Sequence, residues 1–123
     1  ARFRFIPTAI RCALTNQTLT LADAFHDWIY IEDLIDGILK VMENAHDLQG
    51  EVVNIGTGEQ YSNDEVVDLL EKILEKKIHK RYTVSLRDYD SKQWISDSYK
   101  LKQLGWEPKY DLEAGLRKTY ANY

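Results

Sequence analysis

The chain has 123 residues, of which 44% are hydrophobic and 29% are charged, and these values predict one globular domain with a core of modest size. The formal net charge of −4 excludes a general electrostatic attraction to nucleic acid or to an anionic membrane surface. An anionic ligand must therefore be held by a few local basic groups.

The first third of the chain predicts a helix and two short strands, followed by a second helix. Pro7 suits the first turn of a helix, where its missing N–H leaves no bond unmade. One face of this helix holds Ile6, Ile10, Ala13 and Leu14. Residues 18–21 (TLTL) and 27–31 (DWIYI) alternate as short strands do. From Ile31 the spacing becomes helical, and we expect that helix to end near residues 44–46.

The remaining two thirds predict strands and helices in alternation. Residues 52–55 (VVNI) favour a strand buried on both faces, as in a parallel sheet. Ser62 and Glu65 form an S-x-x-E capping box that opens a helix. The core face of that helix holds Val66, Val67, Leu69, Leu70, Ile73 and Leu74. Residues 78–84 predict another strand, and Asp97 and Asp111 can each cap a final helix. Helices alternating with short strands indicate the α/β class.

Two interpretations are open for the acidic group in residues 25–38. These carboxylates could ligate a metal or form an acid–base pair, or they could stabilise the start of a helix through its dipole. The group consists of Asp27, Glu32, Asp33 and Asp36. The histidines His26, His46 and His79 are scattered without ligand spacing, so no metal site is expected.

Two segments could hold a phosphate. The loop GTGEQ, residues 56–60, could present backbone N–H groups to an anion, although a bare strand-to-helix turn needs the same glycines. Arg87 lies in the polar segment LRDYDSKQW and could grip a diphosphate with two parallel hydrogen bonds. The alternative for Arg87 is a solvated surface arginine.

We expect a cytoplasmic protein, because no targeting signal is visible in the sequence and no internal disulfide is possible. Cys12 is the single cysteine and excludes an internal disulfide. No apolar run approaches the length of a membrane span, and no signal peptide is visible. The chain begins without methionine, in what resembles mid-sequence, so we expect a fragment.

Four segments resemble, in order, motifs of one family. They are RFIPTAIRCALTNQTLTL (4–21), HDWIYIEDLIDGI (26–38), GEVVNIGTGEQYSNDEVV (50–67) and RDYDSKQWISDSYKLKQLGWEPKYDLEAGLRKTY (87–120). Together they resemble the C-terminal part of extended short-chain dehydrogenases, the family of nucleotide-sugar epimerases and 4,6-dehydratases. The resemblance covers essentially the whole chain.

This resemblance implies a fold, and it implies that substrate and cofactor bind to different lobes. Residues 1–123 would be a single partial domain, the substrate-binding C-terminal lobe of a Rossmann-type enzyme, with one or two strands belonging to the Rossmann sheet. NAD or NADP would bind the lobe upstream, which also carries the catalytic Tyr-x-x-x-Lys. We therefore expect no catalytic, cofactor-binding or metal-binding residue in this chain alone, and no NAD(P) binding by it.

The resemblance also implies a set of substrate-binding residues. Arg87 matches the family's diphosphate arginine, and His26 stands where the family usually has a second one. Thr20 and Ala22 match strand residues that flank the base, and Asp90 matches a position that often contacts the nucleoside. Trp94 falls near the sugar in some epimerases. Phe5 and Ile6 lie at the mouth of the nucleotide pocket.

Two functions follow from these expectations. The first is the nucleotide-sugar-binding portion of an NAD(P)-dependent epimerase or 4,6-dehydratase that acts through a 4-keto sugar. The alternative is a non-catalytic binding or interaction module derived from the same lobe. The expected partner is a nucleotide-diphosphate sugar, with no nucleic acid and no membrane. Because part of the sheet would be missing, we also expect an exposed apolar surface and self-association or a homodimer.

Overall fold

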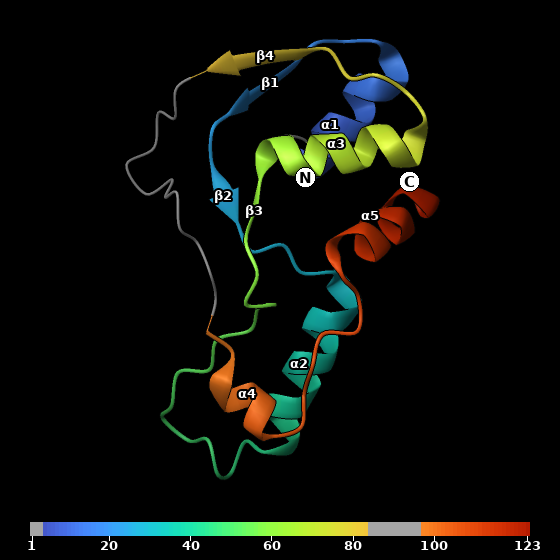
Figure 1. The fold of residues 1–123 in the computed structure, drawn as a ribbon. Helices are drawn as coiled ribbons and strands as arrows, with labels where there is room; N and C mark the ends of the chain where they lie inside the picture. Colours follow the sequence, from blue (N-terminus) through green and yellow to red (C-terminus); the bar gives the residue numbers. More distant parts are fainter. Residues whose placement is uncertain (1–3, 84–96) are drawn as a thin grey trace.

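The computed structural model describes residues 4–83 and 97–123, and it confirms the α/β class. In Figure 1 the strands β1 and β4 lie over α1 and α3, α5 crosses below them, and α2 and α4 extend away at the opposite end. The elements within the described ranges are α1 (Phe5–Thr15), β1 (Leu19–Ala22), β2 (Phe25–His26), α2 (Ile31–Glu43), β3 (Tyr61–Ser62), α3 (Asn63–Leu74), β4 (Lys80–Thr83), α4 (Tyr99–Gln103) and α5 (Leu112–Ala121).

The strands form two small sheets. β1 and β4 pair in parallel, from Leu19 opposite Lys80 to Ala22 opposite Thr83. β2 and β3 pair antiparallel, with His26 opposite Tyr61. Parallel strands need a crossover connection, and here the chain between β1 and β4 includes α2 and α3.

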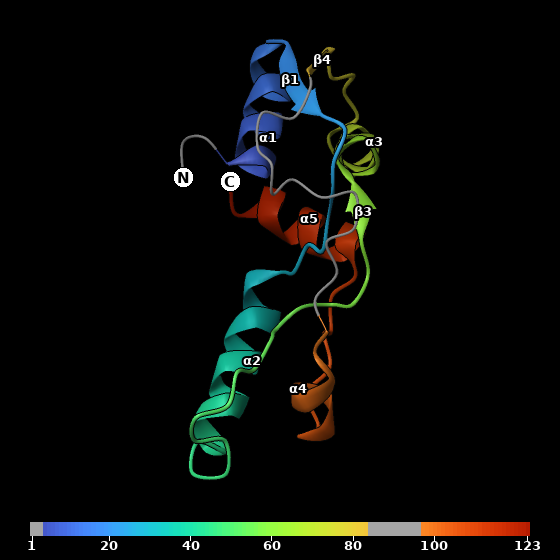
Figure 2. The ribbon, with the colours of Figure 1, turned by 90° about the vertical axis from the view of Figure 1, so that its left-hand side faces the viewer.

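The main core lies between β1, α1, α3 and α5. Figure 2 shows α1 and α3 near β1, with α5 below them. Its fully buried members include Ile10, Leu19, Val66 and Leu70. Helix α1 begins at Phe5, which places Pro7 in the first turn as predicted. Of the side chains that share one face of α1, Ile10 and Ala13 are buried, whereas Leu14, near the end of the helix, is 41% exposed.

The capping box of α3 is confirmed. Glu65 donates its backbone N–H to the Ser62 hydroxyl over 3.1 Å, and Ser62 donates its N–H to the Glu65 carboxylate over 3.3 Å. Asp111 caps α5 in a related way, because its carboxylate accepts the Ala114 N–H at 2.7 Å. Asp97 accepts the Tyr99 N–H at 3.0 Å, at the start of α4.

Removing the Ser62 hydroxyl should destabilise the fold measurably. We expect Ser62→Ala to lower the free energy of unfolding by about 1 kcal/mol, the usual loss for an N-cap replaced by alanine. Ser62→Thr keeps an acceptor and should recover most of that loss. Urea denaturation followed by circular dichroism measures both variants, and equal stability of Ser62→Ala and wild type would contradict the prediction.

Two predicted strands are absent from the described structure. Residues 27–31 do not continue β2, because the Asp27 side chain bonds a loop and Tyr30 already serves as the N-cap of α2. Residues 52–55 form no strand either, and Val52 is 76% exposed. A buried strand requires a neighbour that supplies ladder hydrogen bonds, and among the described residues no segment pairs with this one.

Helix α2 carries an exposed apolar face, whereas the sequence predicted an exposed apolar surface where part of the sheet would be missing. Its outward side chains are between 44% and 65% exposed: Ile31, Ile35, Ile38, Leu39 and Met42. The opposite side packs at Gly37 against Leu101, Trp106 and Ile55. No helix in residues 4–83 or 97–123 has both the length and the apolar character needed to cross a membrane.

Asp33 joins α2 to the chain before α5. This carboxylate is 1% exposed and accepts the backbone N–H groups of Lys109 and Tyr110 at 2.9 and 3.0 Å. The backbone carbonyl of Asp33 also accepts the indole N–H of Trp106 at 3.1 Å. The helix-start interpretation places Asp33 correctly in the first turn of α2, but the carboxylate serves a distant segment.

Candidate functional site

The carboxyl ends of β1 and β4 form one candidate binding edge. Along β1 the buried Leu19 and Leu21 alternate with the exposed Thr20 and the half-buried Ala22. Thr20 and Ala22 therefore share the outer face, opposite Arg81 and Thr83 of β4. In open sheets with parallel strands, ligands bind beyond the carboxyl ends of the strands.

The predicted residues Arg87, Asp90 and Trp94 lie outside the described residues. Their position in the chain is still informative, because the segment that contains them follows β4 directly. Thr83, the last residue of β4, is paired with Ala22. The chain thus leaves the candidate edge at Thr83 and re-enters the described structure at Asp97.

His26 and Phe5 lie against one tryptophan. The His26 ring meets the Trp28 indole edge-on with centroids 5.4 Å apart, and the Phe5 ring lies 5.8 Å from the same indole. The structure therefore brings together two of the predicted residues from α1 and β2. Trp28 itself was not predicted as a site residue, and no motif in the sequence distinguishes it from a core aromatic residue.

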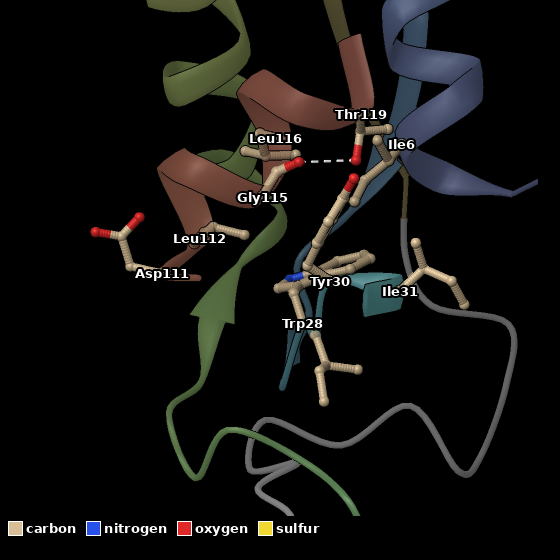
Figure 3. A pocket seen from close by; sticks show the side chains of 10 residues that line it. Ile6, Trp28, Tyr30, Ile31, Asp111, Leu112, Gly115, Leu116 and Thr119 are labelled. Atoms are coloured by element: carbon tan, nitrogen blue, oxygen red, sulfur yellow. Dashed lines mark hydrogen bonds between the residues drawn. The ribbon is translucent and has the colours of Figure 1, made fainter. Parts of the chain in front are cut away.

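A cavity of about 280 Å³ lies between the start of α1, residues 28–31 and α5 (Figure 3). Its walls are mostly apolar and include Ile6, Trp28, Tyr30, Ile31, Leu112 and Leu116. The indole N–H of Trp28 is buried and has no hydrogen-bond acceptor among the described residues. Ile6 thus faces this cavity, whereas Thr20 and Ala22 lie on the outer face of the sheet.

The loop at residues 56–58 is bonded to the side chains of two distant residues. The Asp27 carboxylate accepts the N–H groups of Thr57 and Gly58 at 3.0 and 2.8 Å, and it also accepts the Thr57 hydroxyl. Gly56 donates its N–H to the Ser98 hydroxyl at 2.8 Å. These donors are the ones that a phosphate would use, so the structure favours the turn interpretation of GTGEQ. Gly58 has a φ of +82°, a backbone conformation that suits glycine.

Two tyrosines of β3 and β4 have raised pKa values. A hydrogen bond to the Glu59 carboxylate raises the pKa of Tyr61, and a hydrogen bond to Asp64 raises the pKa of Tyr82. Both phenols therefore stay protonated well above neutral pH. Within the described ranges, no three His, Cys, Asp or Glu side chains gather as a metal site would require.

Asp27, Asp33 and Ser98 are the residues whose structural roles the sequence did not reveal. Each is buried or half-buried and bonds a backbone segment at least thirty positions away. Capping patterns can be found in a sequence because their partners lie three residues apart. Contacts between distant segments leave no such spacing.

Comparisons with known proteins agree with this architecture. The family model described as GDP-mannose 4,6 dehydratase matches residues 3–119. The dTDP-glucose 4,6-dehydratase of Shigella flexneri is 32% identical over 131 residues, covering 98% of this chain and 36% of that protein. The solved structure of UDP-glucuronic acid 4-epimerase from Bacillus cereus, in complex with UDP-glucuronic acid and NAD, superposes with a TM-score of 0.89 at 30% identity. It covers 98% of this chain and 39% of the epimerase chain.

A dehydratase structure gives the same result. The dTDP-glucose 4,6-dehydratase from Bacillus anthracis, in complex with NAD, has a TM-score of 0.82 and 28% identity, with 98% of this chain and 39% of that one covered. The fold is thus that of a C-terminal part of the extended short-chain dehydrogenases. The chain belongs to the GDP-mannose 4,6 dehydratase family. It spans less than two fifths of the length of these relatives.

Proposed function

We propose that this chain is the nucleotide-sugar-binding part of an NAD(P)-dependent nucleotide-sugar epimerase or 4,6-dehydratase. The observation that carries the proposal is the parallel edge of β1 and β4, whose outer face holds Thr20 and Ala22 and whose last residue leads into the segment with Arg87. His26 lies on the neighbouring sheet, so a ligand along this edge could meet groups from both sheets.

The proposed division of labour assigns the cofactor to the rest of the intact protein. NAD, when bound, would take up and return a hydride, passing the sugar through a 4-keto form. The residues of this chain would hold the nucleotide and its diphosphate, and thereby orient the sugar. Arg87 would bind the diphosphate, Asp90 the nucleoside and Trp94 the sugar side, while Phe5 and Ile6 would line the mouth of the nucleotide pocket. The names of the relatives support this class of substrate.

The proposal is tested by titrating the intact protein with a panel of nucleotide sugars. UDP-glucose, UDP-glucuronic acid, dTDP-glucose and GDP-mannose should include at least one ligand that binds saturably in calorimetry. With NAD present, that ligand should give an epimerised product or a 4-keto-6-deoxy sugar. Residues 1–123 alone should bind no NAD. An intact protein that binds none of the four sugars would contradict the proposal, and binding without turnover would favour the non-catalytic alternative.

His26 should contribute less to this binding than Arg87. An imidazole offers fewer hydrogen-bond donors than a guanidinium, and it lacks the planar fork that matches a phosphate. We therefore expect His26→Ala to weaken nucleotide-sugar binding about fivefold at neutral pH, the value of roughly 1 kcal/mol for an ordinary hydrogen bond. His26→Arg should bind as tightly as wild type or tighter. Calorimetry at pH 6 and pH 8 measures this, and a His26→Ala loss as large as that of Arg87→Ala would contradict it.

The exposed face of α2 supports the expectation that the isolated chain self-associates. Burying its five apolar side chains against a second copy would remove a surface that water solvates poorly. Sedimentation velocity of residues 1–123 at micromolar concentration should show dimers or larger species. Ile38→Lys should shift the population towards monomer, whereas Gln49→Lys, the same change of charge at an exposed position after α2, should shift it less. A compact monomer at these concentrations would contradict the expectation.

A further inference from the structure

The loop at residues 56–58 fastens together three segments that are far apart in the sequence. Asp27 binds Thr57 and Gly58 through both of its carboxylate oxygens. The Ser98 hydroxyl accepts the Gly56 N–H and donates to the Gly56 carbonyl, each over 2.8 Å, and Ser98 is 3% exposed. The backbone groups of this loop are therefore bonded to two side chains, Asp27 and Ser98.

The contacts of this loop lie next to the backbone of His26. His26 is paired with Tyr61 in the β2–β3 ladder, and the residue that follows it, Asp27, is bonded to the loop that leads into β3. The ladder has two residue pairs, which give little rigidity by themselves. The bonds from Asp27 to Thr57 and Gly58 hold the loop next to β2, and the His26 ring also contacts the Trp28 indole.

The same bonds also bear on the repulsion between the Asp27 carboxylate and a bound diphosphate. A carboxylate next to a residue that meets a diphosphate would repel that ligand if the carboxylate faced it. Here both Asp27 oxygens accept hydrogen bonds from the loop, two of them from backbone N–H groups whose positive ends face the carboxylate. The negative charge of Asp27 is thus stabilised by hydrogen bonds within the protein, as expected of a side chain that holds a neighbouring residue in position.

We propose that Asp27 is a positioning residue for nucleotide-sugar binding, which it supports by holding His26 in place through the loop at residues 56–58. This inference rests on the proposed function. It assigns to Asp27 no contact with the substrate. It predicts instead that the contribution of Asp27 to binding passes through the His26 side chain.

A double-mutant cycle in the intact protein tests this route. Asp27→Asn keeps the size of the side chain and one acceptor oxygen, but its NH2 group cannot accept a hydrogen bond, so either the Thr57 or the Gly58 N–H loses its acceptor. We expect Asp27→Asn to weaken binding of the best-bound nucleotide sugar of the panel by roughly threefold, within the range of coupled neighbours, and to leave NAD affinity unchanged. In a His26→Ala background the same substitution should change nucleotide-sugar affinity by less than about 1.5-fold.

Two further measurements separate positioning from a general loss of structure. Hydrogen exchange at the Thr57 and Gly58 amides should speed up in Asp27→Asn, whereas exchange in the α3 core should not change. Asp47→Asn removes an exposed carboxylate from the turn after α2, away from the candidate binding edge, and it should match wild type in every assay.

The outcomes distinguish this inference from the function on which it rests. If the wild-type protein binds the nucleotide sugar and Asp27→Asn binds it equally well, the positioning role is overturned and the proposed function stands. Equal losses in the wild-type and His26→Ala backgrounds also overturn it, because Asp27 would then act by another route. A wild-type protein that binds no nucleotide sugar overturns both.

Discussion

Replacing Arg87 with alanine in the intact protein should weaken nucleotide-sugar binding by roughly ten- to a hundredfold. A guanidinium can make two parallel charge-assisted hydrogen bonds to a diphosphate, and hydrogen bonds to charged groups are worth about 1.5–3 kcal/mol each. Water that hydrates the diphosphate after the side chain is removed offsets part of this loss, so we expect a net loss of about 1.4–2.8 kcal/mol, which corresponds to one to two orders of magnitude in affinity. Calorimetric titration with the best-bound nucleotide sugar measures the change.

Three controls test whether the loss of affinity depends on the planar guanidinium of Arg87 and whether it is confined to the nucleotide-sugar site. Arg87→Lys should recover part of the affinity, because an ammonium group supplies a point charge without the planar fork. NAD affinity should not change in either variant, because we assign the cofactor to the rest of the protein. Arg117→Ala removes an exposed arginine of α5 that pairs with Glu113, and it should leave binding unchanged. If Arg87→Ala binds as wild type does, Arg87 is a surface arginine and the diphosphate assignment is wrong.

The second large effect is expected for stability, at Asp33. Replacing Asp33 with alanine should lower the free energy of unfolding by about 3 kcal/mol, because two charge-assisted hydrogen bonds disappear and two backbone N–H groups lose their acceptor. The carboxylate is almost fully buried, so water does not readily replace it. Asp33→Asn keeps one acceptor oxygen and should cost about half as much.

Asp36 provides a matched control for Asp33. It lies one turn along the same helix, but its side chain is 49% exposed and its partner Lys109 lies 4.0 Å away. Exposed ion pairs contribute about 0–1 kcal/mol, so Asp36→Asn should be nearly neutral. Urea denaturation of the four proteins gives the comparison. Hydrogen exchange should speed up at both the Lys109 and Tyr110 amides in Asp33→Ala, at one of them in Asp33→Asn, and at neither in Asp36→Asn. Similar stabilities for Asp33→Ala and Asp36→Asn would contradict the assignment.

The sequence by itself determined the features whose physical causes are local. The apolar spacing of α3 and its capping box depend on residues three or four positions apart, and both are confirmed. The same is true of α2, whose helical period begins at Ile31, and of the aspartate that caps α5. The sequence motifs also identified the family, because motif residues keep their order and spacing through most of the chain.

The tertiary structure decided what depends on partners far along the chain. Residues 52–55 have the composition of a buried strand, yet they form none, because backbone pairing needs a neighbouring segment and not only apolar side chains. Residues 27–31 alternate as a strand does, but the Asp27 carboxylate bonds a loop thirty positions away and ends the ladder at His26. Asp33 was predicted at a helix start, and only the packed fold shows that it accepts hydrogen bonds from residues 109 and 110. A carboxylate bonds whichever N–H groups folding brings to it, so its role follows from long-range contacts that spacing along the sequence does not encode.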